Sequence, residues 1–320
     1  MRSGLAVILA VALAAAALGG AAFRLGGSSS PRPQTAHASL APNQASYLGV
    51  FAPGAPPSYD GVASFAQAAG RQPNLLGYFS GWAAPFDTSF ANMLRTHHII
   101  PLVQIDPTDA TISAIANGTY DDYLRLYADS VRNFRTNVVI GFGQEMNAPW
   151  YSWGYGHVPA STFVAAWQHI VTLFRAEGAN NVTWLWTLQV DGPGTGPIAS
   201  WWPGASYVTW VGLDGFYYRP TDTFMSVFGK TIDQVRTLTG KPVLLSETAV
   251  GPDTDNVFAK IQDLFQGLVG DGLLGLVWFD KDQHAGIYHQ DWRLEDNGNA
   301  QTSFALGASD ELAKTLPTGQ

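Results

Sequence analysis

The chain has 320 residues, of which 46% are hydrophobic and 13% are charged, and its formal net charge at pH 7 is -8. This composition excludes a disordered body, and the scattered Lys and Arg residues exclude a nucleic-acid partner, because no basic stripe is present to meet phosphates. The lack of cysteine excludes disulfides and thiolate chemistry, and the seven histidines form no HxH or HExxH pair, so we expect neither a metal nor another cofactor.

The N-terminus indicates export. An apolar run at residues 5–23 follows Arg2 and is long enough to be the core of a signal peptide or a membrane-spanning anchor. We expect residues 1–25 to be a cleaved signal peptide, with an uncleaved anchor as the alternative. In both cases the protein would be extracellular, either secreted or anchored to the outer face of the cell membrane. Residues 26–44 are rich in Gly, Ser and Pro and lack apolar periodicity, which predicts a disordered linker.

Eight continuous apolar runs follow, as expected for parallel strands that are covered on both faces. They begin at Tyr47, Asn74, His98, Asn137, Asn181, Tyr207, Pro242 and Leu273. Amphipathic segments between them, such as residues 161–178 and 255–270, begin near a capping residue and end at Gly. This alternation predicts an α/β fold, a single (β/α)8 TIM barrel over residues 45–316. The alternative is a doubly wound open sheet, which the lack of a GxGxxG after the first run disfavours.

Two glutamates stand at matching strand ends. Glutamate occurs only five times, yet Glu145 in "IGFGQEMNAPWYSWG" follows the fourth apolar run and Glu247 in "KPVLLSETAV" follows the seventh. Because barrel enzymes act at the C-terminal ends of their strands, both side chains should project into the same mouth. Glycoside hydrolysis needs two such carboxyl groups, one that protonates the leaving oxygen and one that attacks or stabilises the anomeric carbon. A solvated or salt-bridged residue at the rim is the alternative for each.

These segments resemble glycoside hydrolase family 26. "GFGQEMNAPWYSWG" looks like the family's acid/base segment, usually His-Glu-Met-Asn followed by aromatics, and "LLSETAV" is similar to its nucleophile segment. "YLGVFAPG", "GYFSGW" and "WWPGASYVTWVGLDGFYY" match its first, second and sixth strands, so the resemblance covers about residues 46–306. It implies a (β/α)8 barrel, a retaining mechanism with Glu145 as acid/base and Glu247 as nucleophile, and β-linked polysaccharide substrates, most often β-mannan.

The sequence departs from the family pattern near both glutamates. Gln144 stands where the family usually has His, and glutamine can donate a hydrogen bond but cannot supply charge. Ala148 replaces the usual Gly, which is a smaller departure. The family's tyrosine on the sixth strand aligns with Phe216, leaving Tyr217 one place along. Because adjacent strand residues face opposite ways, only one of these two rings can reach the nucleophile.

Six residues are predicted to bind substrate, chiefly because sugar faces stack on aromatic rings. They are Trp150, Trp278, Gln144, Tyr217, Trp82 and Asp214. Core packing explains Trp278 equally well, and Asp214 is equally suited to orienting a catalytic partner. Asp106, at the end of the third predicted strand, is a weaker candidate.

The leading hypothesis is a monomeric, extracellular, retaining endo-β-glycanase that cleaves polysaccharide or oligosaccharide, with β-mannan as the first substrate. A β-glucanase or a β-1,3-xylanase is the alternative within the same class. A non-catalytic carbohydrate-binding protein on the same barrel is the alternative from another class, with Gln144 as a sign of lost activity.

Overall fold

The structure is a computed structural model that describes residues 40–283 and 290–313. The predicted signal peptide or anchor over residues 1–25, most of the predicted linker and residues 314–316 lie outside these ranges. Within the two ranges, no helix is both long enough and apolar enough to cross a membrane.

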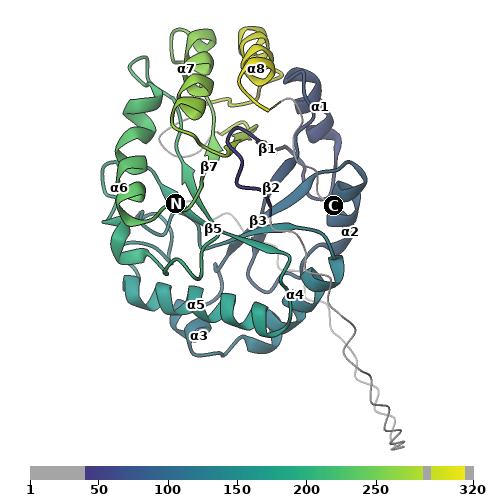
Figure 1. Ribbon diagram of the computed structural model, residues 1–320, viewed down its shortest axis with the longest axis vertical. Coiled ribbons are helices and arrows are strands. Elements are labelled where there is room, and N and C mark those ends of the chain that lie inside the picture. Colours follow the sequence, from purple (N-terminus) through teal and green to yellow (C-terminus); the bar gives the residue numbers. More distant parts are fainter. Residues whose placement is uncertain (1–39, 284–289, 314–320) are drawn as a thin grey trace, which may run out of the picture. The chain divides into compact units, whose positions relative to one another are not determined.

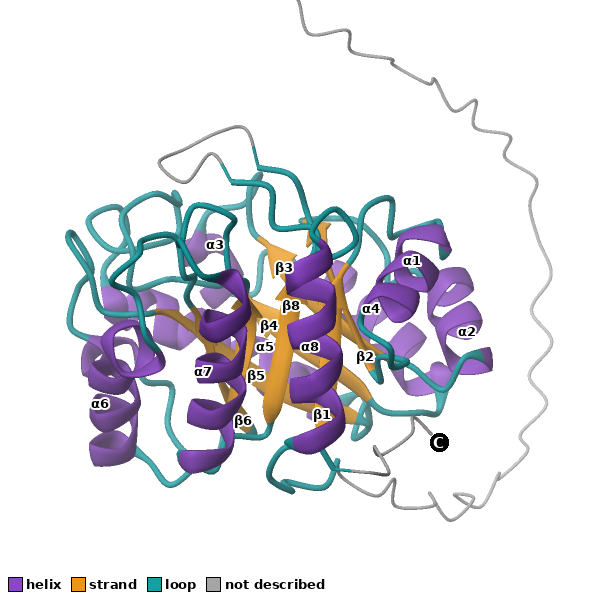
Figure 2. Ribbon diagram, turned by 90° about the horizontal axis from the view of Figure 1, so that it is seen from above, coloured by secondary structure: helices purple, strands orange, loops and turns teal. Residues whose placement is uncertain are grey.

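Eight parallel strands close into a barrel in chain order, which confirms the predicted (β/α)8 fold. The strands are β1 (Tyr47–Phe51), β2 (Leu75–Gly81), β3 (Ile100–Asp106), β4 (Val138–Phe142), β5 (Val182–Gln189), β6 (Trp210–Asp214), β7 (Val243–Thr248) and β8 (Gly275–Phe279). The barrel closes where β8 pairs in parallel with β1. Figure 2, with strands in orange and helices in purple, shows the strands enclosed by the helices.

The helices lie around the strands, as Figure 1 shows. They are α1 (Asp60–Ala68), α2 (Thr88–Thr96), α3 (Ile112–Ala116), α4 (Asp121–Phe134), α5 (Ala160–Ala176), α6 (Lys230–Leu238), α7 (Val257–Gly270) and α8 (Gly298–Asp310), with a 3-10 turn (Ile198–Trp201) and a π-helical turn (Met225–Gly229). The two helices predicted from residues 161–178 and 255–270 are α5 and α7. Helix α7 begins after Asn256 because that side chain caps it, accepting a hydrogen bond from the backbone N–H of Ala259 at 3.1 Å.

Side chains alternate along each strand between the barrel interior and the layer facing the helices. In β1, Tyr47 and Phe51 belong to the interior cluster, whereas Leu48 and Val50 belong to the larger cluster shared with the helices. The same alternation holds in β8, where Val277 points inward. This parity decides which residues at the strand ends can reach the mouth.

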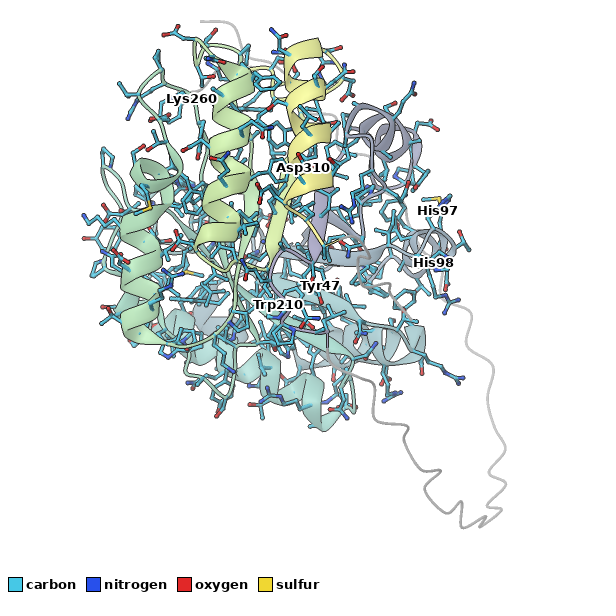
Figure 3. The ribbon with its side chains drawn as sticks, turned by 45° about the horizontal axis from the view of Figure 1, so that its top comes forward. Tyr47, His97, His98, Trp210, Lys260 and Asp310 are labelled. Carbon is cyan, nitrogen blue, oxygen red and sulfur yellow. The ribbon has the colours of Figure 1, made fainter. Side chains whose placement is uncertain are left out.

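The segment before β1 packs against the N-terminal end of the barrel. Leu40 is buried in the interior cluster, and the Tyr47 hydroxyl donates a hydrogen bond to the Ala41 carbonyl at 2.8 Å. The Tyr47 ring lies 4.8 Å from that of Trp210, and Figure 3 labels the two residues. The prediction that a disordered linker extends to residue 44 is therefore wrong for residues 40–44, because burial of the apolar Leu40 draws them onto the barrel.

A polar layer lies inside the barrel beneath its C-terminal mouth. The Gln104 amide donates to the Thr187 hydroxyl at 2.9 Å, and the Ser246 hydroxyl donates to a carboxyl oxygen of Asp214 at 2.5 Å. Gly212 leaves room for this layer, because a Cβ there would lie 2.5 Å from the Ser246 oxygen and 2.9 Å from the Thr187 oxygen. The interior thus changes from apolar to hydrogen-bonded just below the candidate site.

Candidate active site

The loop after β4 carries Glu145 in an uncommon backbone conformation. Gly143 and Glu145 both have φ near +54°, a region that non-glycine residues rarely occupy. The backbone N–H of Gly143 donates to the Ile105 carbonyl at 2.9 Å, and that of Glu145 donates to the Thr187 carbonyl at 3.0 Å. These bonds attach the loop to β3 and β5 and hold Glu145 over the mouth. Left-handed residues held in this way are frequent at functional sites.

Two side chains of the same loop fix its shape. The Asn147 amide donates to the Gln189 carbonyl at 2.8 Å, and its oxygen accepts from the Gln189 backbone N–H at 3.0 Å. The indole of Trp153 donates to the Gln144 carbonyl at 2.9 Å. The Asn of the Glu-Met-Asn motif therefore ties the loop to β5 and helps to position Glu145 two residues earlier.

An irregularity in β7 turns Glu247 toward the mouth. Leu244 faces the interior and Leu245 faces the helices, so strict alternation would also point Glu247 at the helices. The register between β6 and β7 shifts at this point, and Asp214 lies opposite Glu247 where regular pairing would place Ser246. A β-bulge re-aims the side chains that follow it. The bulge therefore brings Glu247 into the group of acidic side chains at the mouth.

The Glu145 carboxyl is shielded from solvent and hydrogen-bonded. Its residue is 9% exposed, and one carboxyl oxygen accepts a hydrogen bond from the indole N–H of Trp150 at 2.6 Å. Burial raises the pKa of Glu145 to about 7, the Trp150 hydrogen bond opposes this shift, and the nearby charge of Asp106 adds to it. A carboxyl group with such a pKa can give up and regain a proton near neutral pH.

Glu247 lies close enough to Glu145 for the two to repel each other when both are ionised. Burial and then the Glu145 charge raise the pKa of Glu247 well above its usual range, while the Lys281 charge lowers it. When Glu145 holds a proton, its repulsion on Glu247 disappears and Lys281 still favours the ionised form. The two carboxyl groups therefore titrate as a coupled pair, and Lys281 stabilises the ionised form of Glu247.

Asp214 is a neighbour of Glu247 rather than a substrate contact. It is fully buried, and burial together with the charges of Glu247 and Glu145 raises its pKa well above the usual range. The prediction that Asp214 binds substrate is wrong because no part of it is exposed. Its place beside Glu247 and its bond from Ser246 fit the alternative, in which it orients a catalytic partner.

The structure adds Asp106 and Tyr151 to this group. Burial raises the pKa of Asp106 to about 6, and the Gln144 amide beside it opposes the shift. Burial and the charges of Glu145 and Glu247 raise the pKa of the Tyr151 phenol above its usual range, and its ring stacks on Trp153 at 4.3 Å. Asp106 stood at a strand end and was a weak candidate, but nothing in the spacing of Tyr151 distinguished it from the other aromatics in its loop.

The opposite side of the mouth is aromatic. Phe51, Phe79 and Phe279 come from the inward positions of β1, β2 and β8, and the Phe51 ring lies 5.0 Å from Phe79 and 6.1 Å from Phe279. The ring of Phe216, which follows β6, lies 5.6 Å from Phe279. Between Phe216 and Tyr217, it is thus Phe216 that joins this side of the mouth.

Three predicted substrate contacts are wrong because their side chains lie in the layer facing the helices. Trp278 is 1% exposed, packs edge-on against Phe304 of α8, and occupies the outward position next to the inward Phe279. The Tyr217 hydroxyl donates to Asp263 of α7 at 2.9 Å. Trp82 is 7% exposed and packs against Tyr120, Tyr123 and Phe142.

Trp150 and Gln144 lie next to the acidic group. Trp150 is 51% exposed and lines a cavity of about 220 Å³ between the ends of β5 and β6, together with Phe216, Tyr218 and Arg219. Gln144 is 2% exposed and lies beside Asp106. Their binding to a sugar stays a prediction. In the described ranges, no group of three or more His, Asp or Glu is arranged to hold a metal ion.

Comparisons with known proteins point to one family. A family model described as glycosyl hydrolase family 26 matches residues 110–250, which include both glutamates. Endoglucanase H of Acetivibrio thermocellus is 25% identical over 80% of this chain and 30% of its own length. The β-1,3-xylanase TXYA of a Vibrio species is 25% identical over 48% of this chain and 34% of its own length. The chain thus spans about a third of the length of these curated relatives.

The solved structures agree in fold. The Bacillus subtilis mannanase man26 has a TM-score of 0.64 and 18% identity, over 86% of this chain and 87% of the mannanase chain. At that identity the likeness concerns the barrel alone. The residues matched by the family model include the loop of Glu145 and the strand of Glu247. The match and these relatives show that residues 110–250 of the chain are similar to glycosyl hydrolase family 26.

Proposed function

We propose that the protein is a retaining endo-β-glycanase, with Glu145 as acid/base and Glu247 as nucleophile. The observation that carries the proposal is the buried pair itself: two glutamates from different strands lie within electrostatic reach at the barrel mouth, and Lys281 acts on only one of them. Environments that push two carboxyl groups toward opposite protonation states are the mark of an acid and a nucleophile.

The reaction proceeds in two steps. Ionised Glu247 attacks the anomeric carbon while protonated Glu145 gives its proton to the leaving glycosidic oxygen, and a glycosyl ester forms on Glu247. Glu145, now ionised, then takes a proton from water, which attacks the same carbon and releases Glu247. The hydrogen bond from Trp150 stabilises Glu145 in its ionised state between the two steps.

We propose β-mannan as the first substrate. The similarity to glycosyl hydrolase family 26 and a further relative named mannan endo-1,4-β-mannosidase, 28% identical over 29% of this chain, support this choice. The names of the curated relatives, an endoglucanase and a β-1,3-xylanase, keep β-glucan and β-1,3-xylan as the alternatives. The departure at Gln144 favours the rival in which the barrel binds glycan without cleaving it.

A substrate panel tests the proposal. The purified protein is incubated with β-mannan, mixed-linkage β-glucan and β-1,3-xylan, with Glu247→Ala as the control for contaminating activity. We expect new reducing ends fastest on β-mannan, a fall in viscosity that precedes most of them, and the β-anomer as the first product in proton NMR. An α-anomer as first product would contradict the retaining mechanism. Glycan retention in affinity electrophoresis without cleavage would favour the binding protein.

The Trp150 hydrogen bond predicts a shift in the pH profile. Trp150→Phe keeps an aromatic ring but removes the N–H that stabilises ionised Glu145, so the pKa of Glu145 should rise from about 7. Because the first step needs Glu145 protonated, the alkaline limb of kcat/KM should move to higher pH, by up to about one unit. Tyr155→Phe, in the same loop, is the matched control. An alkaline limb that stays in place in Trp150→Phe would show that Glu145 is not the group titrating there.

We also propose that the enzyme acts outside the cytoplasm as a monomer. The apolar run at residues 5–23 supports export. Mass spectrometry of the N-terminus of the protein recovered from its native host distinguishes a cleaved signal peptide from a retained anchor, and an intact N-terminus in the cytosolic fraction would contradict both.

A further inference from the structure

We propose that Lys281 is a positioning residue, the countercharge of Glu247, held beside it by a cage of three phenyl rings from Phe51, Phe79 and Phe279. This inference rests on the proposed function, because it assigns the group that keeps the nucleophile ionised.

The position of Lys281 follows from the end of β8. Lys281 lies two residues beyond Phe279, and its ammonium nitrogen lies 5.9 Å from the ring centre of Phe51, 5.3 Å from Phe79 and 5.4 Å from Phe279. Each distance lies within the range in which a cation is attracted by the negative face of a ring. The strands of the three rings, β8, β1 and β2, are consecutive around the barrel.

The backbone on both sides of Lys281 is fixed. The backbone N–H of Asp280 donates to the Phe51 carbonyl at 3.0 Å, and the carbonyl of Lys281 accepts from the Trp292 N–H at 3.0 Å. The Asp280 carboxyl is bound in turn by the Leu294 N–H at 2.8 Å. These bonds therefore fix the backbone position from which the Lys281 side chain extends, and the three rings hold its ammonium group.

In the described part of the chain, no carboxylate is in direct contact with the charge of Lys281. Within residues 40–283 and 290–313, no Asp or Glu oxygen forms an ion pair with its ammonium within 4.0 Å, although Lys281 is half-buried. Burial lowers the pKa of Lys281 and the Glu247 charge raises it, while Lys281 lowers the pKa of Glu247 in return. Each group thus shifts the pKa of the other without a direct ion pair between them.

Other charged groups face Glu247 from the surrounding strands, and all of these are acidic. Glu145 and Asp106 raise its pKa from the β4 loop and from β3, and Asp214 lies opposite it on β6. Among the described residues, Lys281 is the group that favours ionised Glu247. It does not act on Glu145, whose ionised form has only the neutral indole dipole of Trp150 to favour it. Lys281 therefore stabilises the ionised form of Glu247 and not that of Glu145.

The small number of glutamates makes a direct test practical. With only five in the chain, the δ-carbon resonances of 13C-labelled glutamate can be followed through a pH titration, and Glu247→Gln identifies the signal of Glu247. We expect Lys281→Met, which keeps the length but not the charge, to raise the titration midpoint of Glu247 by at least about half a pH unit. Lys281→Arg should leave that midpoint near its original value. An unchanged midpoint in a folded Lys281→Met protein would overturn the proposal.

A reciprocal measurement covers the case in which Lys281→Met does not fold. Because the coupling of two sites is mutual, Glu247→Gln should lower the titration midpoint of the Lys281 ammonium, observed with 15N-labelled lysine. Only five lysines are present, so this signal is also resolvable. A Lys281 midpoint unaffected by Glu247→Gln would likewise overturn the proposal.

Kinetics then separate this proposal from the proposed function. In Lys281→Met, the acid limb of kcat/KM should move up by the same amount as the Glu247 midpoint, with activity recovering at higher pH and in Lys281→Arg. A lysine that merely packs would lower activity equally at all pH values. A protein that cleaves no glycan but still shows the coupled midpoints would contradict the proposed function and leave the countercharge in place.

Discussion

Replacing Glu247 by alanine should lower kcat on the preferred polysaccharide by on the order of 10⁴-fold or more, while oligosaccharide binding persists. The reason is that, among the residues that the structure describes, no other carboxylate is placed to form the glycosyl ester. Asp214 is buried and accepts from Ser246, and Asp106 lies on the far side of the mouth on β3. Steady-state kinetics on the polysaccharide and calorimetric titration with an oligosaccharide measure the two effects separately.

A chemical rescue makes the result specific to a nucleophile. Azide is small enough to enter the space vacated by the Glu247 side chain, and it should attack the anomeric carbon from that face and give a glycosyl azide of inverted configuration. Glu177→Ala removes a glutamate near the end of α5, where it pairs with Arg125 at 3.2 Å, and serves as the matched control with nearly unchanged kcat. Parental turnover in Glu247→Ala would show that this glutamate is not catalytic.

The strand pattern of the barrel was readable from the sequence because buried parallel strands are continuously apolar. The first predicted run begins at Tyr47, where β1 begins, and the seventh begins at Pro242, one residue before β7. Because Glu145 and Glu247 follow such runs, the sequence also placed both glutamates at the C-terminal ends of strands, where barrel enzymes have their active sites. The local hydrophobicity of each segment contains this information without any tertiary contact.

Whether a strand residue points into the barrel or toward the helices was harder to predict, because a shift of one position along the strand reverses the direction of its side chain. Counting in twos from the inward Val277 makes Phe279 inward and Trp278 outward, so parity alone would have rejected Trp278. Counting in twos from the inward Leu244 would likewise have placed Glu247 on the outward face. The side chain reaches the mouth only because a bulge between Leu245 and Glu247 shifts the alternation. A bulge depends on the pairing of two strands, which a single segment does not show.

The electrostatic neighbours of the glutamates are a tertiary property. Lys281 and Asp106 are far apart in the chain, and their charges act on Glu247 only when the barrel closes, from β8 on one side and β3 on the other. The departure at Gln144 raised the question of how the nucleophile stays ionised without a nearby histidine. The sequence offered no candidate for that charge, because a lysine that follows a strand end looks like any surface lysine.

Replacing Glu145 by alanine should have an effect that depends on the leaving group. On polysaccharide, whose leaving alcohol needs a proton, kcat/KM should fall on the order of 10³-fold or more. On aryl glycosides with acidic phenols, which depart without protonation, kcat/KM should fall by less than about tenfold. The hydrolysis of the glycosyl ester also loses its base, so this intermediate should accumulate and KM on the activated substrates should fall.

A series of aryl glycosides with phenols of increasing pKa measures this directly. The parent should show a shallow dependence of kcat/KM on the leaving-group pKa, and Glu145→Ala a steep one, because charge on the departing oxygen is no longer neutralised. The alkaline limb set by the Glu145 pKa of about 7 should also disappear in the variant. Glu247→Ala should instead lower all members of the series alike, since every one of them needs the nucleophile. Equal losses across the series in Glu145→Ala would mean that this residue only shapes the site, and the roles assigned to the pair would fall together.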